Sequence, residues 1–301
     1  MTHYEARPIL GSASDLGEGT LWDERSGFFI WVDIFKNTIK RYNPKTGEIS
    51  KVVLGKSVTY VGKRDGGGFV LALGDSIAFT DKSFKIEREI KLDFDARVLR
   101  TNDGNIDPSG SLWVGTMASA IGGSDVVEGG VTGELYKFDR ELNKSVHRKN
   151  IQIANGMDWS LDGTMMFYID SAPRKIYRYQ FDPKKGEIVR ELSAIDVSDV
   201  TGVPDGMCTD SLGNLWVAFW GCGQVRNYTP EGELLNIVQA PTALTTCPSF
   251  GGEELKTLFI TSAQDQRDPE FAFDSVNDPY GGMCFEVRLP IAGKLDNFYN
   301  G

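Results

Sequence analysis

Five oxygen-bearing side chains recur at one position of a repeated pattern of strand and turn, and they are the part of the chain best suited to chemistry. They are Glu18, Asn102, Asp103, Asn155 and Asp205. Carboxylate and carboxamide oxygens bind hard cations, and a carboxylate can also serve as a general base. Because these residues lie far apart in the sequence, their chemistry depends on a fold that brings equivalent positions of its repeats together.

The repeated unit is a short polar turn followed by an apolar strand. Six such strands are expected, at residues 28–33, 69–73, 112–117, 165–170, 215–220 and 258–263. They align on Trp31, Leu71, Trp113, Tyr168, Trp216 and Phe259. The spacing of roughly 40 to 55 residues is typical of four-stranded propeller blades, and helical periodicity is almost absent. The sequence therefore predicts an all-β, six-bladed β-propeller formed by residues 1–301 as a single domain. Trp113, Tyr168 and Trp216 are expected to pack between blades.

Closure of such a ring gives the N-terminal segment a role. A propeller avoids exposed sheet edges by pairing its two ends within one blade. The segment YEARPIL (4–10) is therefore expected to pair near GGMCFEVRLP (281–290).

The first strand of each blade lines the central channel of a propeller. The five oxygen-bearing residues are therefore expected to converge there from four blades, while the other two blades offer Tyr60–Val61 and Thr246–Cys247 at comparable positions. Buried carboxylates that face one another are costly, so we expect a bound cation: calcium or magnesium, with manganese or zinc as alternatives. The other interpretation is that each acid or amide only caps its own turn, although capping does not require the same position in four blades.

Composition and charge exclude several classes of function. The net charge of −10 argues against nucleic acid and anionic membranes as partners, because both attract basic surfaces. No run of about 18 apolar residues occurs, and the N-terminal sequence MTHYEARPIL lacks the features of a secretory signal. We therefore expect a soluble, cytoplasmic protein that acts on a small molecule, as a monomer or a weak homo-oligomer.

Other catalytic groups are scarce. The chain has four cysteines, Cys208, Cys222, Cys247 and Cys284. They form no Cys-x-x-Cys pair, so we expect reduced thiols rather than a zinc or redox site. Neither His3 nor His147 precedes a channel strand, which argues against a histidine-based hydrolase triad. No nucleotide-binding glycine motif opens a strand-to-helix turn.

Five stretches of the sequence together resemble the motifs of one protein family. They are LGEGTLWD (16–23), RTNDGNIDPSGSLWVGTM (100–117), NGMDWSLDGTMMFYIDS (155–171), PDGMCTDSLGNLWVAFWG (204–221) and FGGEELKTLFITSA (250–263). In this order, and over nearly the whole chain, they are similar to the regucalcin, gluconolactonase and luciferin-regenerating family, also called SMP-30. The resemblance implies a six-bladed propeller with one catalytic divalent metal that hydrolyses lactones of sugar acids.

The resemblance also assigns roles to individual residues. The family's metal ligands fall on Glu18, Asn155 and Asp205, and its substrate-contacting Arg-x-Asn-Asp segment falls on Arg100, Asn102 and Asp103. The implied cofactor is one divalent ion, calcium in the first place, with zinc, manganese, magnesium or iron as alternatives.

One departure from the family pattern leaves the preferred lactone open. Some animal members carry a glutamate three residues after Gly-Thr-Met, where this chain has Ala120. The substrate contact that this glutamate makes in those members is therefore not assigned to a residue of this chain. Glu128, in the Gly-rich loop that follows, could supply a carboxylate, but a solvated loop residue is the simpler interpretation.

The implied reaction is attack of water on the lactone carbonyl. A cation held by the three ligands would polarise that carbonyl and stabilise the charge that develops on its oxygen. The base is either Asp205 or a water bound to the cation. Arg100 and Asn102 would orient the sugar hydroxyls; alternatively, Arg100 is a surface charge at the strand end or the partner of Asp103.

Two other functions stay open at this point. The same scaffold and metal could hydrolyse other esters, including phosphotriesters, because a Lewis acid and a water are not selective by themselves. A propeller with this site could also be a non-enzymatic calcium-binding protein, because a fold does not determine a function. A sugar-lactone hydrolase is the function that the sequence favours.

Overall fold

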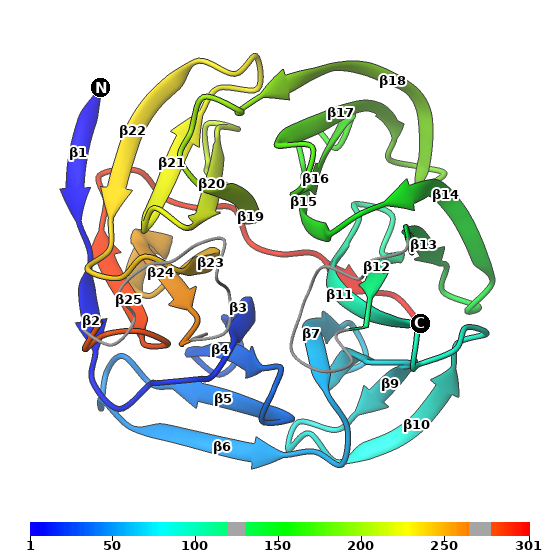
Figure 1. The fold of residues 1–301 in the computed structure, drawn as a ribbon. Coiled ribbons are helices and arrows are strands. Elements are labelled where there is room, and N and C mark those ends of the chain that lie inside the picture. Colours follow the sequence, from blue (N-terminus) through cyan, green and yellow to red (C-terminus); the bar gives the residue numbers. More distant parts are fainter. Residues whose placement is uncertain (120–129, 265–277) are drawn as a thin grey trace.

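The computed structural model describes residues 1–119, 130–264 and 278–301. Its strands form six sheets arranged around a central axis, like the blades of a propeller (Figure 1). The first strand of every blade lies at the centre of the ring and contacts the first strands of both neighbouring blades. The prediction of an all-β, six-bladed propeller is confirmed.

Each blade has four antiparallel strands. The first blade consists of β3 (Gly17–Asp23), β4 (Phe28–Asp33), β5 (Thr38–Tyr42) and β6 (Ile49–Val53), and the second of β7 (Val58–Arg64), β8 (Phe69–Leu73), β9 (Ser76–Thr80) and β10 (Ile86–Lys91). The third consists of β11 (Leu99–Ile106), β12 (Leu112–Ala118), β13 (Gly133–Phe138) and β14 (Lys144–Ile151), and the fourth of β15 (Ala154–Trp159), β16 (Met165–Asp170), β17 (Lys175–Asp182) and β18 (Glu187–Asp196). The fifth consists of β19 (Val203–Thr209), β20 (Leu215–Trp220), β21 (Gln224–Tyr228) and β22 (Leu234–Gln239), and the sixth of β23 (Thr245–Gly251), β24 (Thr257–Ser262), β25 (Cys284–Arg288) and β2 (Arg7–Ile9).

The six apolar segments of the sequence are the second strands of the blades. Both faces of a second strand are covered by neighbouring sheets, which explains its nearly continuous apolar sequence. Trp113 and Tyr168 are fully buried and Trp216 is 1% exposed, so their predicted packing role is confirmed. By contrast, the outer strand β10 is almost entirely exposed.

The polar turns before the second strands are held by a repeated aspartate. Asp107 accepts a hydrogen bond from the indole N–H of Trp113 at 2.8 Å, and Asp210 accepts one from Trp216 at 2.9 Å. Each aspartate also accepts two backbone N–H groups of its own turn. The turn requires a left-handed residue, as at Gly110 with φ 83°. The Asp-x-x-Gly signature therefore fixes both the turn and the tryptophan that packs beside it.

Closure of the ring follows the predicted pairing. Strand β2 pairs antiparallel with β25, and Ile9 lies opposite Cys284. The apolar cluster at this closing interface includes Ile9, Phe29 and Phe259, and the last two rings stack at 4.6 Å. Two further strands pair the chain ends with blades of the ring. Strand β1 (Thr2–Glu5) pairs parallel with β22, and β26 (Phe298–Tyr299) pairs parallel with β7.

Deletion of residues 1–10 is expected to cause aggregation. The deletion removes β1 and β2 and leaves the edges of β22 and β25 without partners, and such edges template strand pairing between molecules. Size-exclusion chromatography with light scattering would measure the effect. A truncated protein that stays monomeric and melts at the temperature of the full chain would show that β2 does not close the ring.

The thiols and the helical content also agree with the expectations from the sequence. All four cysteines are free. Within the described ranges the one helical element is a 3₁₀ turn, Glu253–Leu255. None of the described residues forms a helix long and apolar enough to cross a membrane.

Candidate functional site

The candidate site residues lie at irregularities of the first strands. The pairing of β3 with β4 is interrupted directly after Glu18, and the interruptions in the equivalent pairs contain Asn102–Asp103, Asn155 and Asp205. Such bulges bend a strand and re-aim its side chains. The bulges lie near the starts of β3, β15 and β19 and at the middle of β11, and all of them precede the last residues of their strands. The five side chains therefore gather away from the strand ends that carry Asp23, Ile106, Trp159 and Thr209.

Close packing at the axis explains why glycine follows four of these residues, Glu18, Asp103, Asn155 and Asp205. A Cβ on Gly156 would lie 2.5 Å from the backbone nitrogen of Met207, and a Cβ on Gly206 would lie 2.6 Å from the sulfur of Cys247. Neighbouring first strands therefore approach too closely for any side chain at these positions. An acid or amide followed by glycine is the local sequence signal of the site.

Three carboxyl groups are buried close to one another. Glu18, Asp103 and Asp205 are 7%, 8% and 6% exposed. Burial raises the pKa of Glu18 and Asp205 well above their usual range, and the charge of a neighbouring carboxylate raises it further: Asp205 and Asp103 act on Glu18, and Asp103 acts on Asp205. Burial raises the pKa of Asp103 to about 7. A hydrogen bond from the backbone N–H of Gly104 acts in the opposite direction and lowers this pKa, but its effect is smaller. Negative charge is therefore costly here without a bound cation.

A chain of hydrogen bonds connects the polar residues of the third and fourth blades. Arg100 Nη1 donates to Asn102 Oδ1 at 2.6 Å, Asn102 Nδ2 donates to Asn155 Oδ1 at 3.1 Å, and Asn155 Nδ2 donates to Ser171 Oγ at 2.8 Å. The charge of Arg100 also lowers the pKa of Glu18. Arg100 therefore belongs to the site and is not an isolated charge at a strand end.

The residues present fit a hard divalent cation. Glu18, Asn155 and Asp205 offer only oxygen donors, which suit calcium or magnesium, and the three buried carboxyl groups need positive charge beyond that of Arg100. No three His, Cys, Asp or Glu side chains within the described part of the chain are arranged as a metal site by themselves. The carboxamide of Asn155 offers a further oxygen donor beside these carboxyl groups.

Two aspartates hold the strands that carry Glu18 and Asn155. Asp33, at the end of β4, accepts hydrogen bonds from the backbone N–H groups of residues 15 and 16 at 3.2 and 3.4 Å. Asp170, at the end of β16, does the same for residues 152 and 153 at 3.2 and 3.0 Å. In each case the two N–H groups belong to residues that lie 18 and 17 positions before the aspartate in the sequence. We call this arrangement the aspartate clasp; it fixes the backbone just before each proposed ligand.

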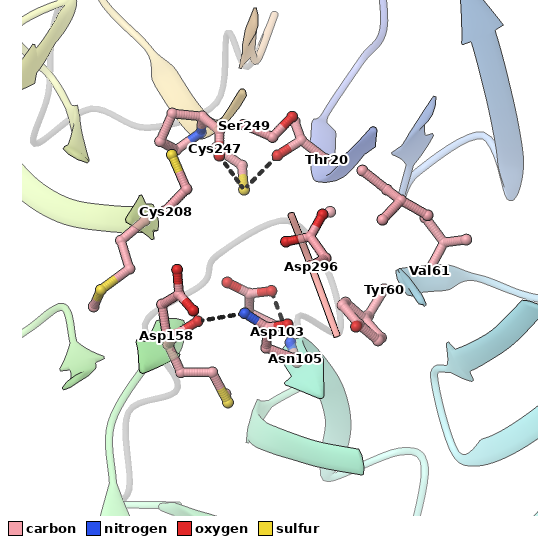
Figure 2. Close-up of a pocket in the computed structure, with 16 residues that line it drawn as sticks. Thr20, Tyr60, Val61, Asp103, Asn105, Asp158, Cys208, Cys247, Ser249 and Asp296 are labelled. Carbon is pink, nitrogen blue, oxygen red and sulfur yellow. Dashed lines mark hydrogen bonds between the residues drawn. The ribbon is translucent and has the colours of Figure 1, made fainter. Parts of the chain in front are cut away.

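A small cavity lies further along the channel, beside Asp103 (Figure 2). Its volume is about 30 Å³, enough for one or two water molecules. The carboxyl groups of Asp103, Asp158 and Asp296 surround it, and the buried hydroxyl of Ser249 at its wall lacks a hydrogen-bond partner among the described residues. The other two blades contribute Tyr60 and the thiol of Cys247 to this lining.

The C-terminal segment covers the far end of the channel. It crosses the centre of the ring (Figure 1, red), where Lys294 pairs with Asp158 and Asn297 donates to the carbonyl of Ile106 at 2.8 Å. Ile106 is the last residue of β11, whereas Asn102 and Asp103 lie at its middle, and Glu18, Asn155 and Asp205 lie near the starts of their strands β3, β15 and β19. The site therefore lies at the end of the channel opposite this segment. Sequence reasoning missed Lys294 and Asp296, because the C-terminal segment lies outside the repeats. It also missed Asp158, which lies within β15 of the fourth blade, three residues after Asn155.

Ala120 and Glu128, where the sequence departs from the family pattern, lie outside the described residues.

Comparison with known proteins agrees with this geometry. The family model described as SMP-30/Gluconolactonase/LRE-like region matches residues 16–264. The chain is 32% identical to regucalcin of Oryctolagus cuniculus over 305 residues, which cover 100% of both chains. It is 30% identical to 6-deoxy-6-sulfogluconolactonase of Pseudomonas putida over 294 residues, which cover 97% of this chain and 98% of that protein.

The architecture is shared as well. A luciferin-regenerating enzyme of known structure superposes with a TM-score of 0.89 at 29% identity, covering 98% of this chain and 99% of that chain. The family match includes all the candidate site positions from Glu18 to Asp205. Because the family model matches most of the chain and the relatives match it over nearly its whole length, this chain belongs to the SMP-30/gluconolactonase/LRE-like family.

Proposed function

We propose that this protein is a divalent-metal-dependent lactonase that opens the lactone ring of a sugar acid. The observation that carries the proposal is the cluster of buried carboxyl and carboxamide oxygens at one end of the channel. Membership of a family that includes a relative named 6-deoxy-6-sulfogluconolactonase supports the substrate class. Glu18, Asn155 and Asp205 are the proposed ligands, with calcium as the first candidate ion.

The bound cation would act as a Lewis acid on the lactone carbonyl oxygen. Asp205 would accept a proton from the attacking water, a role that a carboxylate beside the substrate carbonyl can fill. The new bond joins the water oxygen to the carbonyl carbon, and the ring C–O bond breaks. The proton then passes to the leaving hydroxyl oxygen, so that the product is the open hydroxy acid.

Arg100, Asn102 and Asp103 are proposed to orient the substrate. Arg100 is half-buried, and its bond to Asn102 fixes the guanidinium beside the ligands. In this role the guanidinium of Arg100 would donate to sugar hydroxyls, and Asp103 would accept from them. Holding the ring in this way aligns the carbonyl carbon with the attacking water.

Arg100→Ala is expected to lower kcat/KM for a polyhydroxylated aldonolactone by about 10- to 150-fold, because a hydrogen bond to a charged group contributes roughly 1.5–3 kcal/mol. Unsubstituted butyrolactone has no hydroxyl groups to bind, so its hydrolysis should change far less. Steady-state kinetics on both lactones, with calcium affinity measured in parallel, provides the check. An equal loss on both lactones, or a loss of metal affinity, would assign Arg100 to the ligand shell instead of the substrate.

Titration of acid release from a panel of substrates tests the proposed function directly. The panel contains several aldonolactones, butyrolactone, a simple ester and a phosphotriester. We expect the highest kcat/KM on an aldonolactone. Turnover of the phosphotriester or ester alone would favour a hydrolase of another class. Cation binding with no turnover of any compound would favour a calcium-binding protein.

A further inference from the structure

The carboxamide of Asn155 can face the channel in two ways. An asparagine side chain has an oxygen end and an NH₂ end of similar size, and only the oxygen can bind a cation. The aspartate clasp of Asp170 fixes the backbone before Asn155. It does not determine the rotation of the amide.

The chain of hydrogen bonds that begins at Arg100 has a single direction. A guanidinium can only donate, so the Asn102 oxygen faces Arg100 and its NH₂ group faces the fourth blade. There Asn102 Nδ2 donates to the carbonyl of Ala154 at 2.7 Å and to Asn155 Oδ1 at 3.1 Å. The Asn155 oxygen is thereby turned toward the site, and its NH₂ group needs an acceptor on the opposite side.

Ser171 supplies that acceptor. Its hydroxyl oxygen lies 2.8 Å from Asn155 Nδ2, and the residue is only 1% exposed. Its backbone N–H donates to the carbonyl of Ile153 at 3.1 Å, which ties the serine to the strand it supports. Without this hydroxyl the buried NH₂ group loses its acceptor while Asn155 holds the ligand orientation, and a buried donor without a partner is costly.

We propose that Ser171 is a positioning residue that keeps the Asn155 oxygen turned toward the cation site. The inference rests on the proposed function, because it assumes that Asn155 is a ligand. Ser171 touches neither the cation nor the substrate in this role. It acts by accepting from the buried NH₂ group, so that the orientation set by Asn102 leaves no buried donor without a partner.

Calorimetric titration of the metal-free full-length protein with calcium chloride tests the inference without any substrate. Ser171→Ala is expected to weaken calcium binding by about 5- to 50-fold. Ser76→Ala is the matched control, since Ser76 is also a buried serine whose hydroxyl makes a hydrogen bond, here to Glu89 at 2.6 Å in the second blade. It should leave calcium affinity unchanged. Melting temperatures of the metal-free variants show whether the two substitutions destabilise the fold to a similar degree.

A double-mutant cycle with Asn155→Asp separates orientation from general support. An aspartate has two equivalent oxygens, so it has no wrong orientation, and Ser171→Ala should then weaken calcium binding by less than about 3-fold. An equal loss in both backgrounds, or calcium affinity in Ser171→Ala equal to that of the unaltered protein, would overturn the inference. If Asn155→Asp does not fold, the comparison of Ser171→Ala with Ser76→Ala decides alone. An unaltered protein that binds no divalent cation would overturn the proposed function and this inference with it.

Discussion

Exhaustive chelation is expected to abolish hydrolysis of sugar lactones, and one equivalent of a divalent ion is expected to restore it. The three proposed ligands come from three different blades, and two of them are buried carboxylates with raised pKa values. Without positive charge these groups repel one another, and the carbonyl has no Lewis acid to polarise it. The measurement is acid release by the metal-free protein, before and after addition of calcium, magnesium, manganese or zinc. Full activity in metal-free protein would contradict the mechanism.

Stability of the metal-free protein provides a second measurement that does not depend on activity. The pKa of Asp103 is raised to about 7 in the folded protein, above the ordinary value of 3.8. Between these two values the folded state binds more protons than the unfolded state, so this group lowers stability progressively as the pH rises. Metal-free protein should therefore melt at a higher temperature near pH 6 than near pH 8. Bound calcium should reduce the difference, because it compensates the carboxylate charges.

Asp205→Asn is expected to reduce kcat by about 10²- to 10⁴-fold, the usual contribution of a positioned acid–base group. The amide keeps one oxygen that can bind the cation but cannot take a proton from water. The fold should survive, because the substitution removes a buried negative charge that Asp103 destabilises. Rapid acid-release kinetics at saturating lactone would provide the value.

Asp296→Asn is the matched control for Asp205→Asn. Asp296 is another carboxyl group of the channel, and burial raises its pKa to about 6. It comes from the C-terminal segment, whose Asn297 contacts the last residue of β11, so its replacement should change kcat by less than about 3-fold. Wild-type turnover in Asp205→Asn would remove Asp205 from the reaction. A comparable loss in both variants would show that the effect comes from channel charge in general.

Much of the fold could be predicted because its signals are local. The Asp-x-x-Gly turns and the apolar runs that follow them specify strands within a few residues, and their repetition specifies the number of blades. The pairing of β2 with β25 was also predictable, since a ring of sheets has to close. The pairing of β26 with β7 was not, because Phe298 and Tyr299 belong to no repeat.

The candidate site was predictable only as a set of positions. The same place in four repeats indicated Glu18, Asn102, Asp103, Asn155 and Asp205, and the structure brings all five to one end of the channel. The aspartate clasp left a signal that repeat alignment could have found: Asp33 and Asp170 each follow the proposed ligand of their blade by 15 residues, since 33 − 18 and 170 − 155 are equal. The sequence contains no comparable signal for the role of Ser171, because a serine after a strand is compatible with any turn.

The sequence by itself determined the blade count, the order of the strands and the residue types that line the channel, because turn geometry and apolar patterning act over a few neighbouring residues. Only the tertiary structure decided which way each of these side chains faces and what charge surrounds it. Bulges re-aim the side chains, and the partners of Asn155 come from the third blade and from the end of β16. The raised pKa values arise from carboxyl groups that lie up to nearly two hundred residues apart in the chain, as Glu18 and Asp205 do. Burial and Coulomb repulsion depend on distance in space, which no local pattern encodes.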